Sequence, residues 1–292
     1  MQDFYNLIAE PTLIALLAWW FGTGIILLMV RLPQNKFPIA RGFWTIISLA
    51  ALFFIAKSMR DNSNSSTYIG FLSTIVIWGW HELAFLTGWI CGSRKIKLEP
   101  NLQFWSRFKQ SVEAIWHHEL ALFINLIVLL ALQVGQPNHT AICTYTLLWL
   151  MRLSSKLNLF FGVPQVGEQY LPKHLTYMAS YFRKCSVGPF FFFSMSISSI
   201  IWALIIFQAQ SGQVEITLHW VLLAALLGLA IVEHILMMIP FSIESVWGWA
   251  LRNKWIDVNK GKEILISEKL EDQIILPIAT QSLLNRSTAE PK

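Results

Sequence analysis

Nine ionisable side chains interrupt stretches of this sequence that are otherwise strongly apolar. They are His81, Glu82, His117, His118, Glu119, Arg152, Lys156, Glu233 and His234. Ionisable groups at membrane depth are costly and rare, and they usually face one another or a functional cavity. We therefore expect the three glutamates to converge in one polar pocket, with histidines between them and the two basic side chains beside them.

The first interpretation of this pocket is structural. Glu82 or Glu233 would pair with Arg152 or Lys156, and the histidines would hydrogen-bond to carboxylates or to backbone groups. A charge buried without such a partner is strongly destabilising, so pairing is the expected default. On this interpretation the two basic side chains act as charge partners and do no chemistry.

The second interpretation is a metal site, because carboxylate and imidazole ligands suit iron, manganese or zinc. Its candidate ligands are Glu82, Glu119, Glu233, His118 and His234. The Glu-x-x-His spacing of soluble di-iron bundles is absent, since Phe85 and Leu122 stand three residues after Glu82 and Glu119. The residue types therefore allow a transition-metal enzyme, such as an oxidase or hydroxylase, without specifying one.

The third interpretation is a pigment site, in which a histidine binds the magnesium of a chlorin-type tetrapyrrole or the iron of a haem. The candidate histidines are His81, His117, His118 and His234. The chain contains 14 Trp and 20 Phe residues, which offer aromatic surface for stacking on such a ring. The residues alone leave all three interpretations open.

The composition points to a membrane protein. Of its 292 residues 55% are hydrophobic and 13% are charged, whereas soluble globular proteins carry about 25% charged residues. The three cysteines are far apart and form no CxxC pair, which argues against a disulfide framework or a zinc ribbon. The N-terminus lacks the basic residues of a cleavable signal peptide. The GxSxG, Walker, HExxH and GxGxxG motifs are missing, so no common enzyme class is indicated.

Seven stretches are apolar enough, some of them narrowly, to form membrane-spanning helices of about 20 residues. They are Leu13–Val30, Gly42–Ala56, Tyr68–Gly92, Glu119–Gly135, Thr140–Leu150, Pro189–Ala209 and Ile216–Ile243. With the N-terminus outside, 20 of the 22 Lys and Arg residues fall on the cytoplasmic side, in agreement with the positive-inside rule. The predicted fold is an all-α, polytopic membrane bundle of seven transmembrane helices, with the N-terminus outside and the C-terminus cytoplasmic.

The remaining sequence divides into three predicted parts. Residues 101–118 have apolar side chains near helical spacing, with Arg107 and Lys109 on the other side, which predicts an amphipathic helix in the membrane interface. Residues 158–181 contain two glycines and two prolines, which predicts a structured cytoplasmic loop. We assign residues 1–250 to one membrane domain and residues 251–292 to a polar, partly disordered cytoplasmic tail.

The charge balance also bears on partners. The net charge of +5 requires no nucleic acid, because basic residues that face the anionic cytoplasmic leaflet account for it. The lipid bilayer is therefore the first predicted partner of this chain.

Several longer strings resemble the PuhE-type photosynthetic complex assembly proteins of anoxygenic phototrophic bacteria. These strings are WGWHELAFLTGWICG (78–92), HHELA (117–121), RLSSKLNLFFGVPQVGEQYLPKHLTYMASYF (152–182) and EHILM (233–237). The resemblance runs from about Trp78 to Trp249. It implies a seven-span bacterial inner-membrane protein whose gene accompanies that of the reaction-centre H subunit, and it transfers no catalytic residue.

The resemblance also implies a function in photosynthesis. The expected function is an assembly factor that supports reaction-centre and light-harvesting complexes and the supply or handling of bacteriochlorophyll. The implied partners are reaction-centre or light-harvesting subunits and pigment-synthesis proteins. The alternative is a membrane metalloenzyme that uses the glutamates and histidines above to act on a tetrapyrrole or another lipid-soluble substrate.

Overall fold

The computed structural model describes residues 5–168, 171–211, 214–239 and 244–251. Within these ranges the chain is helical and has no strand, apart from one isolated bridge between Val163 and Lys184. The helices are η1 (Tyr5–Ala9), α2 (Glu10–Val30), η2 (Gln34–Lys36), α3 (Phe37–Ser58), α4 (Asn64–Leu86), α5 (Phe104–Gln133), α6 (Thr140–Phe161), η4 (Lys173–Tyr181), α7 (Pro189–Ser211), α8 (Val214–Leu236) and α9 (Glu244–Leu251). The predicted all-α class is therefore confirmed.

Of the described helices, six are long and apolar enough to cross a membrane, namely α2, α3, α4, α5, α7 and α8. The protein is therefore a multi-pass membrane protein. α6 is 22 residues long, but Arg152 and Lys156 lie in its second half and lower its hydropathy. A seventh span at this helix, like the orientation of the two termini, stays a prediction.

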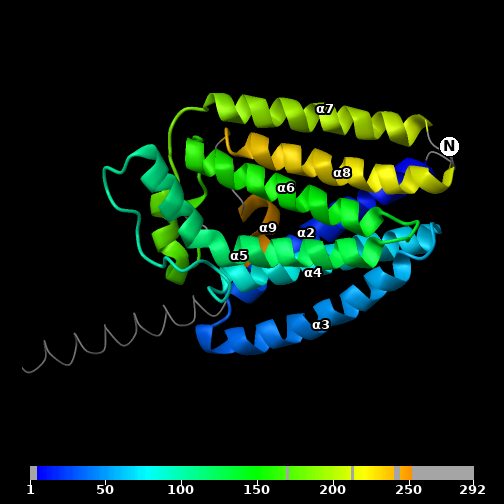
Figure 1. The fold of residues 1–292 in the computed structure, drawn as a ribbon, viewed down its shortest axis with the longest axis horizontal. Coiled ribbons are helices and arrows are strands. Elements are labelled where there is room, and N and C mark those ends of the chain that lie inside the picture. Colours follow the sequence, from blue (N-terminus) through cyan, green and yellow to red (C-terminus); the bar gives the residue numbers. More distant parts are fainter. Residues whose placement is uncertain (1–4, 169–170, 212–213, 240–243, 252–292) are drawn as a thin grey trace, which may run out of the picture. The chain divides into compact units, whose positions relative to one another are not determined.

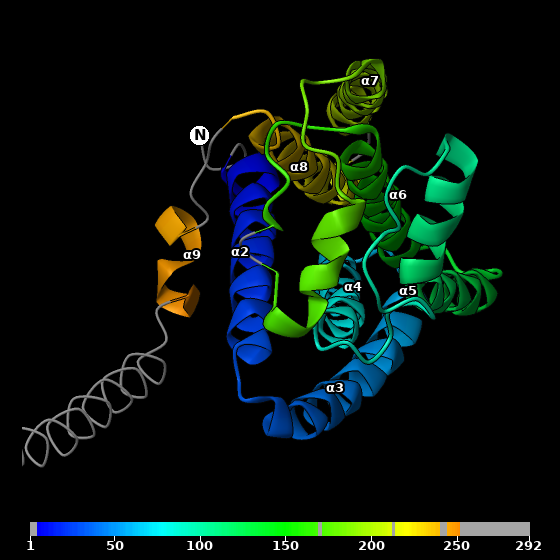
Figure 2. The same ribbon diagram turned by 90° about the vertical axis from the view of Figure 1, so that its left-hand side faces the viewer.

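Four helices surround the centre of the bundle. α2 packs against α4 and α8, and α6 packs against the same two helices. α3 lies against α4, α5 against α6, and α7 against α8, so these three helices form an outer layer (Figure 2). Each long helix from α2 to α8 runs in the opposite direction to the one before it (Figure 1). The ring of α2, α4, α6 and α8 positions most of the ionisable side chains.

Two of the predicted spans are too long at their C-terminal ends. α4 ends at Leu86 rather than at Gly92, because the chain turns at Gly88, whose φ of +74° suits glycine. α8 ends at Leu236 and a turn follows it. Residues 240–243, which the prediction included in this span, lie outside the described residues.

Two other predicted spans are too short. α3 begins at Phe37, with Pro38 in its first turn, where the missing N–H of proline leaves no helical hydrogen bond unmade. α6 continues past Arg152 and Lys156 to Phe161. These two charges do not end the helix because each has a carboxylate partner on a neighbouring helix.

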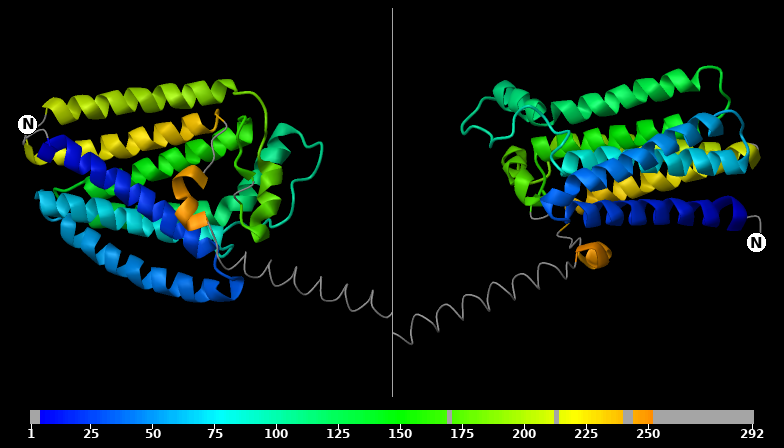
Figure 3. Two further views of the ribbon diagram at one scale, coloured as in Figure 1. Left: turned by 180° about the vertical axis from the view of Figure 1, so that it is seen from behind. Right: turned by 90° about the horizontal axis from the view of Figure 1, so that it is seen from below.

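α5 is one bent helix, where the sequence predicted an interfacial helix followed by a separate span. Its first part lies at a steep angle to the rest (Figure 3). At the bend the loop after α4 reaches the helix backbone: the Cys91 carbonyl accepts a 2.9 Å hydrogen bond from the His118 N–H, and the Arg94 N–H donates to the Glu113 carbonyl at 3.3 Å. Insertion of other groups into a helical hydrogen-bond ladder is a known cause of kinks. The interfacial position of the first part stays a prediction.

Gly92 makes this close approach possible. A Cβ atom at this position would lie 2.0 Å from the Glu113 carbonyl oxygen in the backbone of α5. We expect Gly92→Ala to lower the amount of protein in the membrane, because the loop and helix backbones would have to separate. Gly188→Ala is the matched control, since no atom lies within 4 Å of a Cβ there. An unchanged immunoblot signal for Gly92→Ala would contradict the contact.

The predicted cytoplasmic loop 158–181 is partly helical, since it begins in α6 and ends in η4. Arg107 of α5 holds it in place. The guanidinium donates to the carbonyls of Phe160 at 2.8 Å and Tyr181 at 3.0 Å, and it lies over the Phe160 ring. The Tyr181 hydroxyl in turn accepts a 3.0 Å hydrogen bond from Arg94. The loop after α4, the first part of α5, the end of α6 and η4 are therefore joined by hydrogen bonds. We call this end of the bundle the cap.

The residues from Gly248 onward form a second unit, of which Gly248–Leu251 are described. Apart from Leu251, the predicted polar tail of residues 251–292 lies outside the described residues. Its predicted disorder is therefore untested.

Candidate functional site

α6 carries two basic side chains on consecutive turns, and each has a carboxylate partner on another helix. The Arg152 guanidinium lies 2.8 Å from Glu82 Oε2 of α4. The Lys156 ammonium bonds to Glu119 Oε1 of α5, and the other oxygen of Glu119 accepts a 3.2 Å hydrogen bond from the Trp149 indole. The side chains of Lys156 and Glu119 are 15% and 18% exposed. Glu82 is 13% exposed and Arg152 is 39% exposed. The two pairs link α6 to α4 and α5.

The structural interpretation offered Glu82 or Glu233 as the partner of a basic side chain; Glu82 is the one that pairs, with Arg152, and Glu233 of α8 has a neutral partner. Its Oε1 accepts a 3.0 Å hydrogen bond from the Trp19 indole of α2. Arg152 and Glu82 nevertheless lie close enough to Glu233 to interact with it electrostatically. The three glutamates thus gather around the second half of α6, as two ion pairs and one carboxylate bound by an indole.

Three of the four candidate histidines are buried. His81 Nε2 lies 3.4 Å from the Tyr145 hydroxyl, and His234 Nε2 lies 3.0 Å from the Ser154 hydroxyl. His118 is 1% exposed, and neither of its ring nitrogens has a hydrogen-bond partner among the described residues. The buried histidines therefore divide into two that contact hydroxyl groups and one that lacks a polar contact.

His117 does not join the buried histidines. It is exposed on α5, whereas the adjacent His118 faces inward. Neighbouring residues of an α-helix point about 100° apart, so both imidazoles cannot face the same pocket. The structure therefore does not bring His117 into the predicted site.

The described residues offer no cluster for a metal ion. No group of three or more His, Cys, Asp or Glu side chains within the described ranges is arranged to hold one. Two of the candidate ligands, Glu82 and Glu119, are instead engaged with basic side chains, which compete with a cation for the same oxygen atoms. This arrangement does not favour the metal interpretation.

A cavity of about 470 Å³ lies among α2, α4, α6 and α8. Most of its lining is apolar, and Trp19, Trp44 and Trp78 contribute aromatic rings to it. Ligand sites in proteins are typically concave and mostly apolar, with a few polar groups that fix the orientation of the ligand. The cavity is apolar along most of its wall, as such ligand sites are.

Most polar groups of the cavity come from α6 and the glutamates around it. We call the ionisable side chains Glu82, Glu119, Arg152, Lys156 and Glu233 the charge cluster. Of these, Glu82, Arg152 and Glu233 line the cavity, together with Ser155 and Thr23. Glu82 Oε1 and Arg152 Nε have no hydrogen-bond partner among the described residues, so each retains bonding capacity beyond the ion pair. None of the candidate histidines is among the lining residues. The structure thus joins the predicted carboxylates and the guanidinium, but not the imidazoles, to one apolar cavity.

Sequence reasoning missed the contribution of α2 to this site. Trp19, Gly22 and Thr23 line the cavity, and Trp19 is also the hydrogen-bond partner of Glu233. A usable signal lay in the charge count. With two basic side chains for three glutamates, one carboxylate needs a neutral donor, and an indole N–H on another helix is such a donor.

The match to known proteins covers all the long helices. Over residues 6–256 the chain matches the family described as "Protein of unknown function (DUF3623)". A relative from Rhodobacter capsulatus, described as an uncharacterized 30.4 kDa protein in the puhA 5' region, is 34% identical over 252 residues, which is 83% of this chain and 91% of the relative. No solved structure matches the chain. By the extent of both similarities, the chain belongs to the DUF3623 family.

Proposed function

We propose that this protein is a photosynthetic complex assembly factor of the bacterial inner membrane that holds a lipid-soluble molecule in the cavity among α2, α4, α6 and α8. In this role it supports the assembly of reaction-centre and light-harvesting complexes and the supply or handling of bacteriochlorophyll. The observation that carries the proposal is the cavity itself, because its apolar walls and the Glu82–Arg152 pair together suit an apolar molecule with a polar group.

The photosynthetic part of the proposal is supported by the relative from Rhodobacter capsulatus. That relative is described as a protein in the puhA 5' region. The strings at 78–92 and 152–182 resemble PuhE-type proteins, and that resemblance implies a gene beside the one for the reaction-centre H subunit. The proposed partners are accordingly reaction-centre or light-harvesting subunits and pigment-synthesis proteins.

The charges at the cavity wall favour one class of polar group on the ligand. Two carboxyl groups, Glu82 and Glu233, line the cavity with a single guanidinium, Arg152, so hydrogen-bond acceptors outnumber cationic donors. This environment favours a ligand group that donates hydrogen bonds and disfavours a carboxylate or a phosphate. A tetrapyrrole bound here would be held by stacking on tryptophan and by these polar groups, because no histidine lines the cavity.

The metalloenzyme alternative is not favoured. Its carboxylate ligands Glu82 and Glu119 are paired with Arg152 and Lys156, and His118 does not line the cavity. An oxidase or hydroxylase would need ligands that converge on an open coordination position next to the substrate. The proposed role therefore rests on binding rather than on metal chemistry.

We also propose that α6 is a seventh span, with the N-terminus outside and the C-terminus cytoplasmic. α6 is 22 residues long and contacts α4, α5, α7 and α8, which are all apolar enough to cross the membrane. Among the described basic residues, Lys57 and Arg60 stand apart near the end of α3, whereas the others lie toward the opposite end of the bundle. This asymmetry favours the orientation with the cap in the cytoplasm.

Cysteine labelling tests this topology. In a chain whose native cysteines are replaced by alanine, a single cysteine at Asn62 should react with an impermeant maleimide from the outside. Single cysteines at Asn101 and Gln165 should react only after the membrane is opened. Equal labelling of Asn62 and Asn101 from one side would refute the orientation.

Deletion of the gene from a phototrophic host tests the proposed function. The level of reaction centre and of bacteriochlorophyll in membranes is expected to fall several-fold, while respiratory complexes, as the internal control, stay unchanged. Expression of the intact chain should restore both. Normal reaction-centre absorbance in the deletion strain would overturn the proposal.

A further inference from the structure

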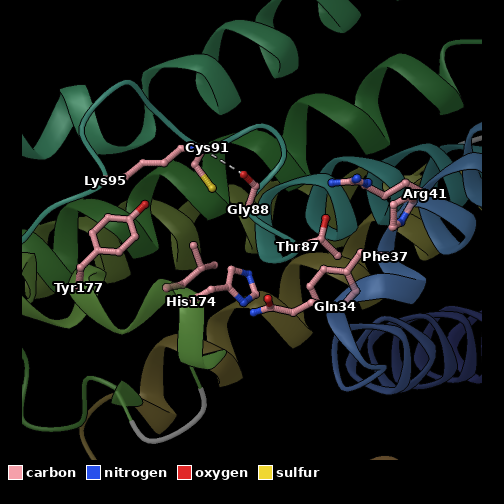
Figure 4. Close-up of a pocket in the computed structure, with 11 residues that line it drawn as sticks. Gln34, Phe37, Arg41, Thr87, Gly88, Cys91, Lys95, His174 and Tyr177 are labelled. Atoms are coloured by element: carbon pink, nitrogen blue, oxygen red, sulfur yellow. Dashed lines mark hydrogen bonds between the residues drawn. The ribbon is translucent and has the colours of Figure 1, made fainter.

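A second pocket lies apart from the central cavity, beside the cap. It has a volume of about 370 Å³ and is formed by the start of α3, the loop after α4, and η4. Figure 4 shows Arg41 and Phe37 on one side of it, Lys95 and Tyr177 on the other, and His174 between them. None of these residues belongs to the charge cluster around α6.

Two cationic side chains line this pocket, and no carboxylate does. Neither Arg41 nor Lys95 forms an ion pair within the described part of the chain. The Arg41 guanidinium lies over the Trp89 ring, 5.2 Å from its centroid, which fixes its position and leaves its N–H groups for other contacts. The Lys95 ammonium approaches the Gly88 carbonyl at 3.4 Å and has further donors. The pocket is therefore positively charged.

The pocket also offers groups that attract an anion without carrying a full charge. The Tyr177 hydroxyl has no hydrogen-bond partner among the described residues. Burial raises the pKa of Tyr177 to about 12, so its hydroxyl keeps the proton at neutral pH. Phe37 and Pro38 bring the first turn of α3 to the wall, and the positive end of a helix dipole favours an anion there. These groups together suit an oxyanion.

Gly88 keeps the pocket open. A Cβ atom at this position would lie 3.1 Å from Cδ2 of the His174 ring. The ring itself is held by a 3.0 Å contact between His174 Nε2 and the Leu86 carbonyl. The loop after α4 can therefore approach η4 and leave the space between Arg41 and Lys95 free of side chains from residue 88.

The position of the pocket indicates whether the anion belongs to a lipid or to a soluble molecule. On α3, next to Arg41, the side chains of Ile39 and Phe43 are 66% and 58% exposed, as expected for a surface that faces lipid tails. Basic pockets between transmembrane helices on the cytoplasmic side bind the head groups of anionic lipids. We infer that this pocket binds a phosphate group, and, resting on the orientation proposed above, that its site at the cytoplasmic edge of the membrane selects the head group of an anionic phospholipid.

Native mass spectrometry of the detergent-purified full chain tests this inference. Phosphatidylglycerol and phosphatidylcholine are added separately to the wild type and to Arg41→Gln/Lys95→Gln. We expect the wild type to retain phosphatidylglycerol over phosphatidylcholine, and the double variant to bind it about ten-fold more weakly. Lys57→Gln/Arg60→Gln removes the same charge near the end of α3 and should bind like the wild type.

Two further measurements complete the test. One shows whether a charge-preserving variant still binds, and the other shows whether the phosphate group belongs to a lipid or to a soluble molecule. Arg41→Lys/Lys95→Arg keeps both charges and should retain the preference for phosphatidylglycerol. Inorganic diphosphate that binds to the wild type and not to the glutamine double variant, without any lipid preference, would support the phosphate site and assign it to a soluble ligand. Equal binding of phosphatidylglycerol and of diphosphate to the wild type and both glutamine variants would overturn the inference.

Discussion

Lys156→Ala is expected to reduce the amount of the protein in the membrane several-fold. Glu119 would remain inside the bundle with the Trp149 indole as its one described partner. Removal of one member of a buried ion pair typically costs about 3–5 kcal/mol, because the other charge is left uncompensated. Immunoblotting of membranes from cells with equal transcript levels measures the effect.

A second change separates loss of the pair from loss of the lysine. Lys156→Met combined with Glu119→Gln removes both charges and should recover most of the lost protein, because no uncompensated charge remains. Lys57→Ala, near the other end of the bundle, should leave the level unchanged. If Lys156→Ala accumulates as well as the wild type does, the pair is not a structural link between α5 and α6.

Gly22→Leu is expected to abolish function while the protein still accumulates. Gly22 lines the central cavity, and the nearest atom to a Cβ there is Ile75 Cγ2 at 3.6 Å, an ordinary contact distance. The added side chain would therefore enter the cavity rather than force α2 and α4 apart. In a phototrophic host the reaction-centre level should fall to that of the deletion strain, as measured by membrane absorbance.

Gly42→Leu is the matched control for this change. Gly42 is exposed on α3, and no atom lies within 4 Å of a Cβ there. Gly42→Leu makes the same chemical change on an exposed helix face outside the cavity, so reaction-centre levels should stay normal. Normal levels in Gly22→Leu, with the protein present, would show that the cavity is not used.

The sequence predicted the helices well because long apolar stretches are the strongest pattern in this chain. It misjudged the end of α4 for a local reason. The apolar residues continue from α4 through Gly92, but Gly88 turns the chain and Gly92 has to lie against α5. That packing depends on Glu113, which is distant in sequence, so hydropathy alone could not locate the helix end.

The ionisable residues of the site could be found from their cost at membrane depth, but their pairing could not. Arg152 and Lys156 are one turn apart on α6 and face two different helices, which gives Glu82 and Glu119 separate partners. Glu233 is left to the indole of Trp19. Such choices depend on how the helices are rotated against one another, and periodicity does not determine this rotation.

The cavity could not be predicted, because its lining comes from several helices and consists mostly of ordinary apolar side chains, with a few small residues among them. Gly22 and Thr23 carry no chemical signature, and the GTG string to which they belong is equally typical of close helix packing. For the histidines the prediction failed in the opposite way, because it included residues that do not line the cavity. They have the chemistry of ligands, yet His81, His118 and His234 lie outside the lining of the cavity.

The most direct test of the proposed role is the content of lipid-soluble molecules in the purified protein. The wild type, Gly22→Leu and Gly42→Leu are purified from the phototrophic host, extracted with organic solvent, and quantified by absorption and mass spectrometry. A stoichiometric pigment-type or other lipid-soluble compound in the wild type and in Gly42→Leu, and its absence from Gly22→Leu, is the predicted result. The same extract from all three proteins, or bulk phospholipid alone in each, would contradict the assignment of a ligand to the central cavity.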